Sequence, residues 1–469
     1  MSAAEQVDTD RGEPTLNRVM GPGLLLLFVV GDILGTGVYA LTGKVAAEVG
    51  GAVWLPFLVA FLVAILTATS YLELVTKYPQ AAGAALYTHK AFGIHFLTFM
   101  VTFTVMCSGL TSASSASEAF ASNFVEAFEL SIGEDSALTL LALAFISLIA
   151  LVNFRGVSES VKVNVLLTCV ELTGLLIIIC IGAWALTRGA GDTSRLLDFD
   201  TAQGQTGFGA VTAATALAFF AMVGFEDSVN MAEETKDPVR IFPRVMLLGL
   251  VITGVIYVLV SISSVALVSP EELGEGDAPL LKVVAAGAPG FPVGVFAFIT
   301  MFAVANSALI NMLMASRLLY GMSRQRVLPR FLGKVHRRRR TPWAGILFTT
   351  AIAFGLIFFA DLEALGGTTS LLLLCVFTIV NVAVLVLRRD PVEHDHFHAP
   401  TALPVIGAVA CAYLASPLSG RPGADYRIAA VLTVIGIVLW AVTAAVQRHL
   451  LHEDVTPDPS RLDAPAPPP

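Results

Sequence analysis

Glycine residues interrupt two long apolar stretches of this sequence, and both interruptions also contain carboxyl or hydroxyl side chains. The first covers Gly31–Tyr39 and the second covers Phe220–Ser228. A bilayer offers no water to free backbone groups, so a membrane helix unwinds only where its N–H and C=O groups face a cavity or a ligand. Two interruptions that lie five apolar stretches apart are typical of a secondary transporter whose substrate lies near the middle of the bilayer.

The ends of a broken helix carry opposite partial charges and therefore suit different ligand groups. The N–H groups that follow a break near Gly35–Gly37 favour a carboxylate. Carbonyls near Met222, Val223 and Gly224 end the first half of the other broken helix and favour an ammonium group. The alternative is that the glycines only allow neighbouring helices to pack closely.

Two carboxyl groups are expected inside the membrane without a basic neighbour in the sequence. Asp32 precedes Gly35 by three residues, and Glu171 lies within the fifth apolar stretch. A carboxylate at this depth must be paired, hydrated or protonated. We interpret Asp32 as a ligand for a cationic substrate or a carrier of a coupling proton, and Glu171 as a proton carrier. A static hydrogen-bonding role is the alternative for each.

Further polar residues beside the two interruptions are candidates for ion coupling. Asp227 either takes part in coupling or caps the second half of the broken helix together with Ser228. Asn306 and Ser307 lie in an eighth apolar stretch otherwise made mainly of alanine, methionine and leucine. Hydrogen bonding between helices is the simplest role for these two residues. A sodium or substrate site is the alternative.

The composition places most of the chain in lipid. The 469 residues are 56% hydrophobic and 14% charged, with a mean hydropathy of +0.78, whereas soluble domains are about 25% charged. We predict an all-α integral membrane protein, because a membrane-spanning helix needs roughly 20 apolar residues. Twelve stretches are long enough: 20–42, 52–76, 93–122, 137–154, 161–186, 209–232, 244–268, 290–318, 343–360, 365–387, 401–417 and 428–447.

The distribution of basic residues predicts the orientation in the membrane. With the N-terminus placed inside, only six of the 28 basic residues fall on the outer side, namely Lys44, Arg188, Arg195, Lys282, Arg421 and Arg427. The positive-inside rule therefore predicts both termini in the cytoplasm. We expect the location to be the cell's plasma membrane. We interpret the run Arg337–Arg340 as a topology determinant that contacts anionic lipid, rather than a nucleic-acid site.

The spacing of the interrupted stretches predicts how the chain is divided. Five spans precede the second interrupted one, and an odd number inverts the second set, so spans 1–5 (15–188) and 6–10 (205–390) form inverted repeats. Spans 11 and 12 (400–450) carry little polarity and are expected to be peripheral. The terminal segments 1–14 and 451–469 are expected to be disordered.

Several segments resemble the amino acid–polyamine–organocation transporters. The resemblance covers roughly residues 18–450 and rests on four motif regions in the matching order. These are Gly35–Tyr39; Phe219–Glu226 with Ala232–Pro238; Ala315–Arg324 with Val327–Pro329; and Tyr71–Leu74 with Tyr78-Pro79 and Gly83–Tyr87. The resemblance implies a leucine-transporter-type fold with spans 1 and 6 broken and two extra helices.

The resemblance also implies roles for particular residues. In the family the first break receives the substrate's α-carboxylate, which would fall to Thr36, Gly37 and Val38. Phe225 would close the substrate from one side, and Glu226 aligns with an acidic position common in the family. Some proton-coupled members have a lysine near the position of Glu171, so their mechanism does not transfer directly to this chain.

These features together predict a secondary active transporter for amino acids or related amines. We expect alternating access with proton-coupled import or exchange, and membrane lipid as the surroundings. A polyamine or potassium transporter is one alternative, because Asp32, Glu226 and Asp227 would attract a cation. Gly31–Ile33 also faintly resembles a motif of potassium-uptake permeases. A transporter-like nutrient sensor is another. No phosphate loop, nucleophile–base pair or metal cluster is evident, so we expect neither an enzyme nor a cofactor nor a nucleic-acid partner.

Overall fold

The structure is a computed structural model, and every regular element that it describes is a helix. It describes residues 20–80, 83–128, 130, 135–155, 160–199, 207–232, 235–324, 330–336, 339 and 341–446. An isolated bridge joins Met20 to Thr235. The predicted disordered segments 1–14 and 451–469, and most of Arg337–Arg340, lie outside the described residues.

The helices are joined by connections of varied length. In chain order the α-helices are α1 (Pro22–Ile33), α2 (Thr36–Val49), α3 (Trp54–Lys77), α4 (Gly83–Phe92), α5 (His95–Ala127), α6 (Asp135–Arg155), α7 (Ser160–Thr187), α8 (Gly207–Ala218), α9 (Pro238–Leu267), α10 (Pro270–Gly274), α11 (Pro279–Gly287), α12 (Val293–Arg324), α13 (Trp343–Phe359), α14 (Leu362–Leu387), α15 (Ala402–Ala415) and α16 (Gly423–Val446). Short 3-10 helices include η3 (Phe219–Met222) and η4 (Asp227–Met231).

Ten helical segments of the described chain are long and apolar enough to cross a membrane. They coincide with ten of the twelve predicted spans, so the protein is a multi-pass membrane protein. The two remaining predicted spans, 343–360 and 401–417, correspond to the shorter apolar helices α13 and α15. These have 17 and 14 residues, below the roughly 20 that a perpendicular crossing needs.

Both glycine-rich interruptions are irregular in the structure. The first helix stops at Ile33 and the next begins at Thr36. In the second interruption, α8 gives way to η3, and Gly224 has a φ of 123°, which only glycine adopts readily. The chain then continues as η4, where a second half-helix was expected. Bonds from Val223 N–H to the Phe220 carbonyl (3.3 Å) and from Asp227 N–H to the Gly224 carbonyl (3.0 Å) hold this tighter path.

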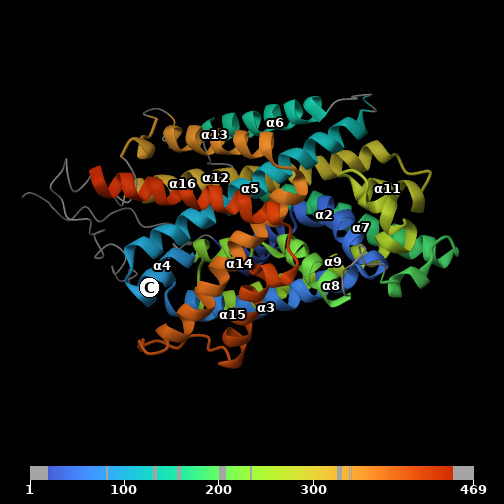
Figure 1. The fold of residues 1–469 in the computed structure, drawn as a ribbon. Coiled ribbons are helices and arrows are strands. Elements are labelled where there is room, and N and C mark those ends of the chain that lie inside the picture. The colour runs from blue at the N-terminus through green and yellow to red at the C-terminus, as the bar shows by residue number, and fades with distance from the viewer. Residues whose placement is uncertain are drawn as a thin grey trace, which may run out of the picture.

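The interrupted segments lie inside a bundle of longer helices. Helix α1 packs on α7 and α9, α2 packs on α8, and α5 runs along both α12 and α14. Figure 1 shows α6 and α13 together along one side of the bundle and α3 with α15 along the opposite side. The breaks are therefore shielded from the bundle's outer surface, where unpaired backbone groups would be costly.

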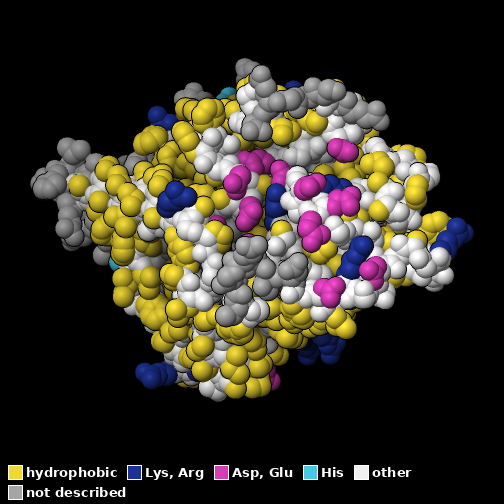
Figure 2. Space-filling model, turned by 45° about the vertical axis from the view of Figure 1, so that its right-hand side comes forward, with side chains coloured by type: hydrophobic (Ala, Val, Ile, Leu, Met, Phe, Trp, Pro, Cys, Tyr) yellow, Lys and Arg dark blue, Asp and Glu magenta, His cyan; other side chains and the backbone are white. Residues whose placement is uncertain are grey.

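The two ends of the bundle differ in charge. We call the end that carries Glu48, Asp277, Asp361 and Glu363 the acidic end; Figure 2 shows acidic side chains gathered around a hollow of the surface. At the other end of α14, Arg388 donates to both carboxylate oxygens of Glu73 at 2.7 Å. These hydrogen bonds raise the pKa of the Arg388 guanidinium.

Candidate transport site

The two interruptions interlock through backbone contacts at glycine. A Cβ added to Gly37 would lie 2.5 Å from Cα of Ala221, and one added to Gly224 would lie 2.5 Å from the carbonyl oxygen of Asp32. Neither contact leaves room for a methyl group. Gly37 and Gly224 are therefore required for packing whether or not they also contact a substrate.

Other groups of the protein form hydrogen bonds with some of the free backbone groups at the first break. The Ile33 carbonyl accepts a hydrogen bond from the buried Tyr257 hydroxyl of α9 at 2.6 Å and another from Gly35 N–H at 2.8 Å. On the other side, the first turn of α2 has no capping side chain, because its N-cap residue is Gly35. The positive end of α2 thus lacks the side-chain oxygen that usually caps a helix.

A small cavity lies where the breaks meet. Its volume is about 20 Å³, enough for about one water molecule and too small for an amino acid, so the site is contracted. It is lined by Asp32, Ile33, Gly35, Thr36, Gly37, Ser112, Phe220, Val223, Gly224, Asp227, Ser307 and Asn311. Eight of these residues were predicted from the sequence; Ile33, Ser112, Phe220 and Asn311 were not.

Four predicted substrate residues lie outside this lining, namely Val38, Met222, Phe225 and Glu226. Val38, Met222 and Phe225 are fully buried. The Phe225 ring packs against Tyr71 and Phe377, with ring centroids 5.8 and 5.3 Å away. In this contracted state Phe225 therefore belongs to an aromatic cluster, and a role in closing over the substrate stays a prediction.

A second cavity of about 20 Å³ adjoins the first between α5 and α12. Val223, Asp227 and Asn311 line both cavities, and Glu226 lines only the second. An oxygen of Glu226 accepts the Gly224 N–H at 2.9 Å. This carboxyl group therefore stabilises the irregular backbone of the second interruption while it also faces the cavity.

Glu171 lies behind the first break, on α7. The Tyr39 hydroxyl donates to the backbone carbonyl of Glu171 at 2.6 Å, so α7 contacts the beginning of α2. The Glu171 side chain is fully buried, and neither of its carboxylate oxygens has a hydrogen-bond partner among the described residues. Asn306 lies near this carboxyl group, and its side-chain oxygen accepts from Asn164 at 3.4 Å.

Asn306 and Ser307 thus face different parts of the protein. Asn306 faces α7 and the region of Glu171, whereas Ser307 lines the transport cavity. The predicted coupling residues therefore fall into two groups on either side of the first break.

Sequence reasoning missed Ser112 as a cavity residue and left Asn311 without a role in the site. The Asn311 amide donates to the Ser112 hydroxyl at 3.3 Å and to the Ser307 carbonyl at 2.9 Å. Asn311 follows Ser307 by four residues, which places both on one face of α12. That spacing was the available signal, but the partner helix was not visible in the sequence.

The acidic residues around the breaks have no basic counterpart. Within the described part of the chain, Asp32, Glu171, Glu226 and Asp227 take part in no ion pair. The buried bases are engaged elsewhere, since Arg421 pairs with Asp425 and Lys77 donates to the Leu387 carbonyl at 2.6 Å. Unpaired carboxylates are expensive at membrane depth, so protons or a cationic ligand must neutralise this region.

A multi-pass helical bundle with two interlocked broken segments around a polar cavity defines a membrane transporter, not an enzyme. The amino acid permease family model matches residues 24–445. The chain therefore belongs to the amino acid permease family, within the amino acid–polyamine–organocation superfamily that the motif regions resemble.

Individual relatives are similar to this chain along most of their length. The branched-chain amino acid permease BcaP of Bacillus subtilis is 24% identical over 87% of this chain and 89% of its own length. The methylthioribose transporter of the same bacterium is 28% identical over 89% and 92%. The cationic amino acid transporter 9, chloroplastic, of Arabidopsis thaliana is 28% identical over 93% and 78%.

Proposed function

We propose that this protein moves amino acids or related amines by alternating access, with the substrate held between the two interruptions. The observation that carries the proposal is the cavity formed jointly by Gly35–Gly37 and Val223–Gly224. It brings the positive end of α2 close to a segment of irregular backbone with carboxyl groups beside it. An amino acid carries the complementary pair of charges, a carboxylate and an ammonium group.

The substrate's carboxylate would bind at Thr36, Gly37 and Val38, where the helix dipole favours an anion. Its ammonium group would bind near the Val223 carbonyl and the carboxyl groups of Asp32 and Asp227. Because the cavity of about 20 Å³ is too small for an amino acid, the site must widen before the substrate binds. This requirement is consistent with a site that alternates between the two sides of the membrane.

We propose protons as the coupling ion, carried by Asp32 and Glu171. Glu171 is buried without a hydrogen bond to either oxygen, which favours a protonated carboxyl group in an apolar setting. Asp32 lines the cavity and lies near enough to interact electrostatically with Glu171. A proton that moves between Asp32 at the cavity and Glu171 in the interior would link substrate binding to proton movement.

A cationic substrate is the second candidate, and the unpaired acidic groups favour it. Glu226 and Asp227 both face the cavity between α5 and α12, where a second positive charge on the substrate would neutralise them. The relatives include a branched-chain amino acid permease and a cationic amino acid transporter. A lysine- or polyamine-like substrate is therefore tested beside neutral ones.

The orientation is part of the proposal. We place both termini in the cytoplasm and the acidic end outside, in the plasma membrane, because basic residues concentrate in the loops opposite the acidic end. Spans 1–5 and 6–10 would form the inverted repeats that exchange access between the two sides.

The Thr36 hydroxyl offers a direct test of the site. It lines the cavity, is buried and has no hydrogen-bond partner among the described residues. In proteoliposomes with an inward proton gradient, we expect uptake of one class among neutral amino acids, cationic amino acids and polyamines. Thr36→Val should raise the KM for that substrate about 5- to 10-fold, the effect of roughly one lost hydrogen bond.

Thr42→Val is the matched control, because the Thr42 hydroxyl bonds to the Val38 carbonyl within α2 at 2.6 Å and lines no part of the cavity. Equal KM values in the two variants would remove Thr36 from the site. If potassium alone stabilises the purified protein, the substrate is an inorganic cation rather than an amino acid.

A further inference from the structure

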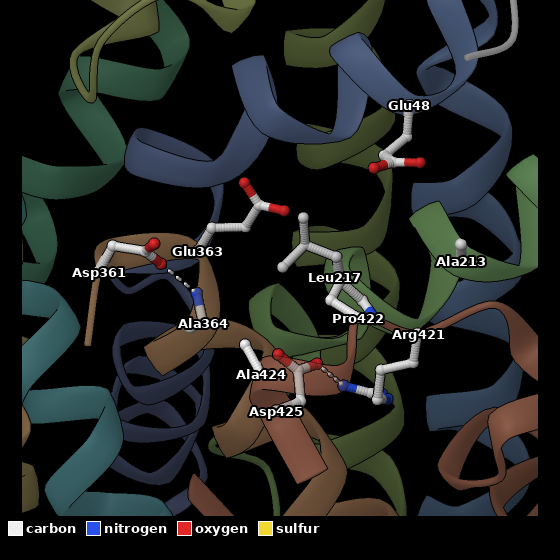
Figure 3. Close-up of a pocket in the computed structure, with 10 residues that line it drawn as sticks. All are labelled: Glu48, Ala213, Leu217, Asp361, Glu363, Ala364, Arg421, Pro422, Ala424 and Asp425. Atoms are coloured by element: carbon white, nitrogen blue, oxygen red, sulfur yellow. Dashed lines mark hydrogen bonds and ion pairs between the residues drawn. The ribbon is translucent and has the colours of Figure 1, made fainter. Parts of the chain in front are cut away.

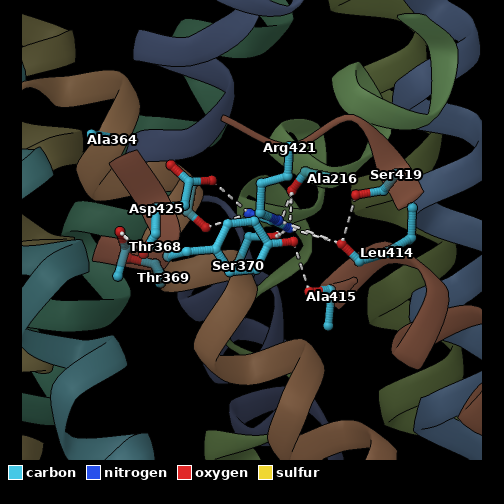
Figure 4. Close-up of polar contacts among 12 residues, drawn as sticks. Ala216, Ala364, Thr368, Thr369, Ser370, Leu414, Ala415, Ser419, Arg421 and Asp425 are labelled. Carbon is cyan, nitrogen blue, oxygen red and sulfur yellow. Dashed lines mark hydrogen bonds and ion pairs between the residues drawn. The ribbon is translucent and has the colours of Figure 1, made fainter. Parts of the chain in front are cut away.

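One arginine outside the predicted site is buried among backbone carbonyls. Arg421 lies in the connection between α15 and α16, and its side chain is 1% exposed. It forms an ion pair with Asp425 at 2.9 Å and donates to the Gly367 carbonyl at 2.6 Å. It also donates to the Ala216 carbonyl at 3.2 Å. Figure 4 shows the guanidinium at the centre of these contacts.

These contacts join elements that are far apart in the sequence. Ala216 lies two residues before the end of α8, just ahead of the second interruption, and Gly367 lies in the first turns of α14. Ser370 of α14 strengthens the junction, because its hydroxyl donates to the Ala216 carbonyl at 2.5 Å and accepts from Arg421 at 3.2 Å. Arg421 therefore fastens α8 to α14.

The neighbouring chain is shaped to admit this ion pair. A Cβ on Gly367 would collide with the carboxylate of Asp425, so only glycine lets the carboxyl group approach α14 so closely. Asp425 is also fully buried, with its side chain 3% exposed. Spans 11 and 12, expected to be peripheral, thus insert a charged pair into the transporter's interior.

The pair lies between two cavities. At the acidic end, a cavity of about 140 Å³ is lined by Glu48, Asp361, Glu363, Arg421 and Asp425 together with apolar residues that include Leu217 (Figure 3). A Cβ on Gly366 would lie 2.6 Å from Leu41 and 3.5 Å from Phe220. Phe220 also lines the transport cavity, so a thin layer of packed side chains separates the two spaces.

We propose that Arg421 and Asp425 are positioning residues that keep the acidic-end entrance of the transport site closed. This inference rests on the proposed alternating access and on the acidic end facing outside. Substrate entry from that side requires α8 and α14 to separate above Leu41 and Phe220. That movement must break the hydrogen bonds of Arg421 to Ala216 and Gly367.

The test measures access to both sides of the site without substrate. The exposed Cys169, Cys180 and Cys375 are first replaced by alanine. A single cysteine then replaces either Leu41, above the transport cavity, or Met314, which lines the second cavity. The rate of reaction with a membrane-impermeant methanethiosulfonate is measured in right-side-out and inside-out vesicles. A cysteine at the exposed Ala47 measures reagent reactivity.

With Arg421→Met, we expect Leu41→Cys to react about 10-fold faster from outside, since removing one member of a buried ion pair shifts an equilibrium by at least that much. Met314→Cys should react more slowly from inside, because opening one side closes the other. The reaction rates with Arg421→Lys should lie between those of the parent and those with Arg421→Met. If Arg421→Met does not reach the membrane, the nearly isosteric Asp425→Asn takes its place.

An unchanged rate at Leu41→Cys would overturn the proposal. So would a rise at both cysteines together, because general loosening of the fold exposes both sides at once. The measurement needs no transport, so it remains decisive if the protein proves not to carry amino acids. In that case the proposed function fails while opposite changes at the two cysteines still support the closing role of Arg421.

Discussion

At the scale of single residues, the unusual feature is Glu171. The side chain is fully buried, its carboxylate oxygens lack partners in the described part of the chain, and Asn306 is the polar side chain beside it. An ionised carboxylate in this position would carry the full cost of burial. The position is therefore suited to a group that gains and loses a proton during the transport cycle.

Neutralising this carboxyl group separates proton coupling from substrate binding. We expect Glu171→Gln to retain exchange of labelled for unlabelled substrate but to lose accumulation driven by a pH gradient. Both are measured in proteoliposomes, and a several-fold fall in accumulation at an unchanged exchange rate is the expected result. Glu118→Gln, which removes a partly exposed carboxyl group of α5, should accumulate like the parent. Full accumulation by Glu171→Gln would exclude Glu171 as the proton carrier.

At the scale of elements, the two interruptions support each other. The Gly224 backbone lies against the Asp32 carbonyl, and the Gly37 backbone lies against Ala221. Each irregular segment therefore forms part of the wall that shields the other from lipid. The hydrogen bonds at each break come from elsewhere, from Tyr257 at Ile33 and from Glu226 at Gly224, so the two segments support each other by packing.

Gly224 is expected to be the less tolerant position of the pair, because its φ is 123° in addition to the close contact. Gly224→Ala should lower stability by about 2–4 kcal/mol, from backbone strain together with the displaced Asp32 carbonyl. A fall of several degrees in the unfolding temperature of the purified protein is the measurable effect. Gly321→Ala is the matched control, since nothing lies within 4 Å of the added methyl group; a similar fall there would contradict this explanation.

At the scale of the whole molecule, α14 is fastened near both of its ends. Arg421 and Asp425 contact its first turns through Gly367, and Arg388 at its last turn is paired with Glu73 of α3. The two cavities at the interruptions are small, each about 20 Å³. Under the proposed alternating access, we expect one end of α14 to be released while the other stays fastened.

The charge asymmetry of the two ends predicts which side faces the cytoplasm. A cysteine in place of the exposed Glu275, near the acidic end, should react with an impermeant reagent added to intact cells. A cysteine in place of the exposed Arg389 should react only after the membrane is permeabilised. The reverse pattern would invert the proposed topology and, with it, the side that Arg421 closes.

Much of this architecture could be predicted from the order of residues alone. Length and hydropathy are local properties, so the positions of ten spans followed from counting apolar residues. The two interruptions were also visible, because Gly31–Tyr39 and Gly224 place glycine where an apolar helix would otherwise continue. Eight residues of the transport cavity were named for the same reason, since they lie within or beside those interruptions or share a helix with a polar neighbour.

Only the tertiary structure decided which distant residues meet. Ser112 joined the site through Asn311 on another helix, and Arg421 proved to be buried between α8 and α14 although its sequence reads as a polar loop between two apolar stretches. Hydropathy reports how a segment partitions between water and lipid. It carries no information about which helix faces which, because that choice depends on side-chain shape and hydrogen-bond geometry summed over the whole bundle.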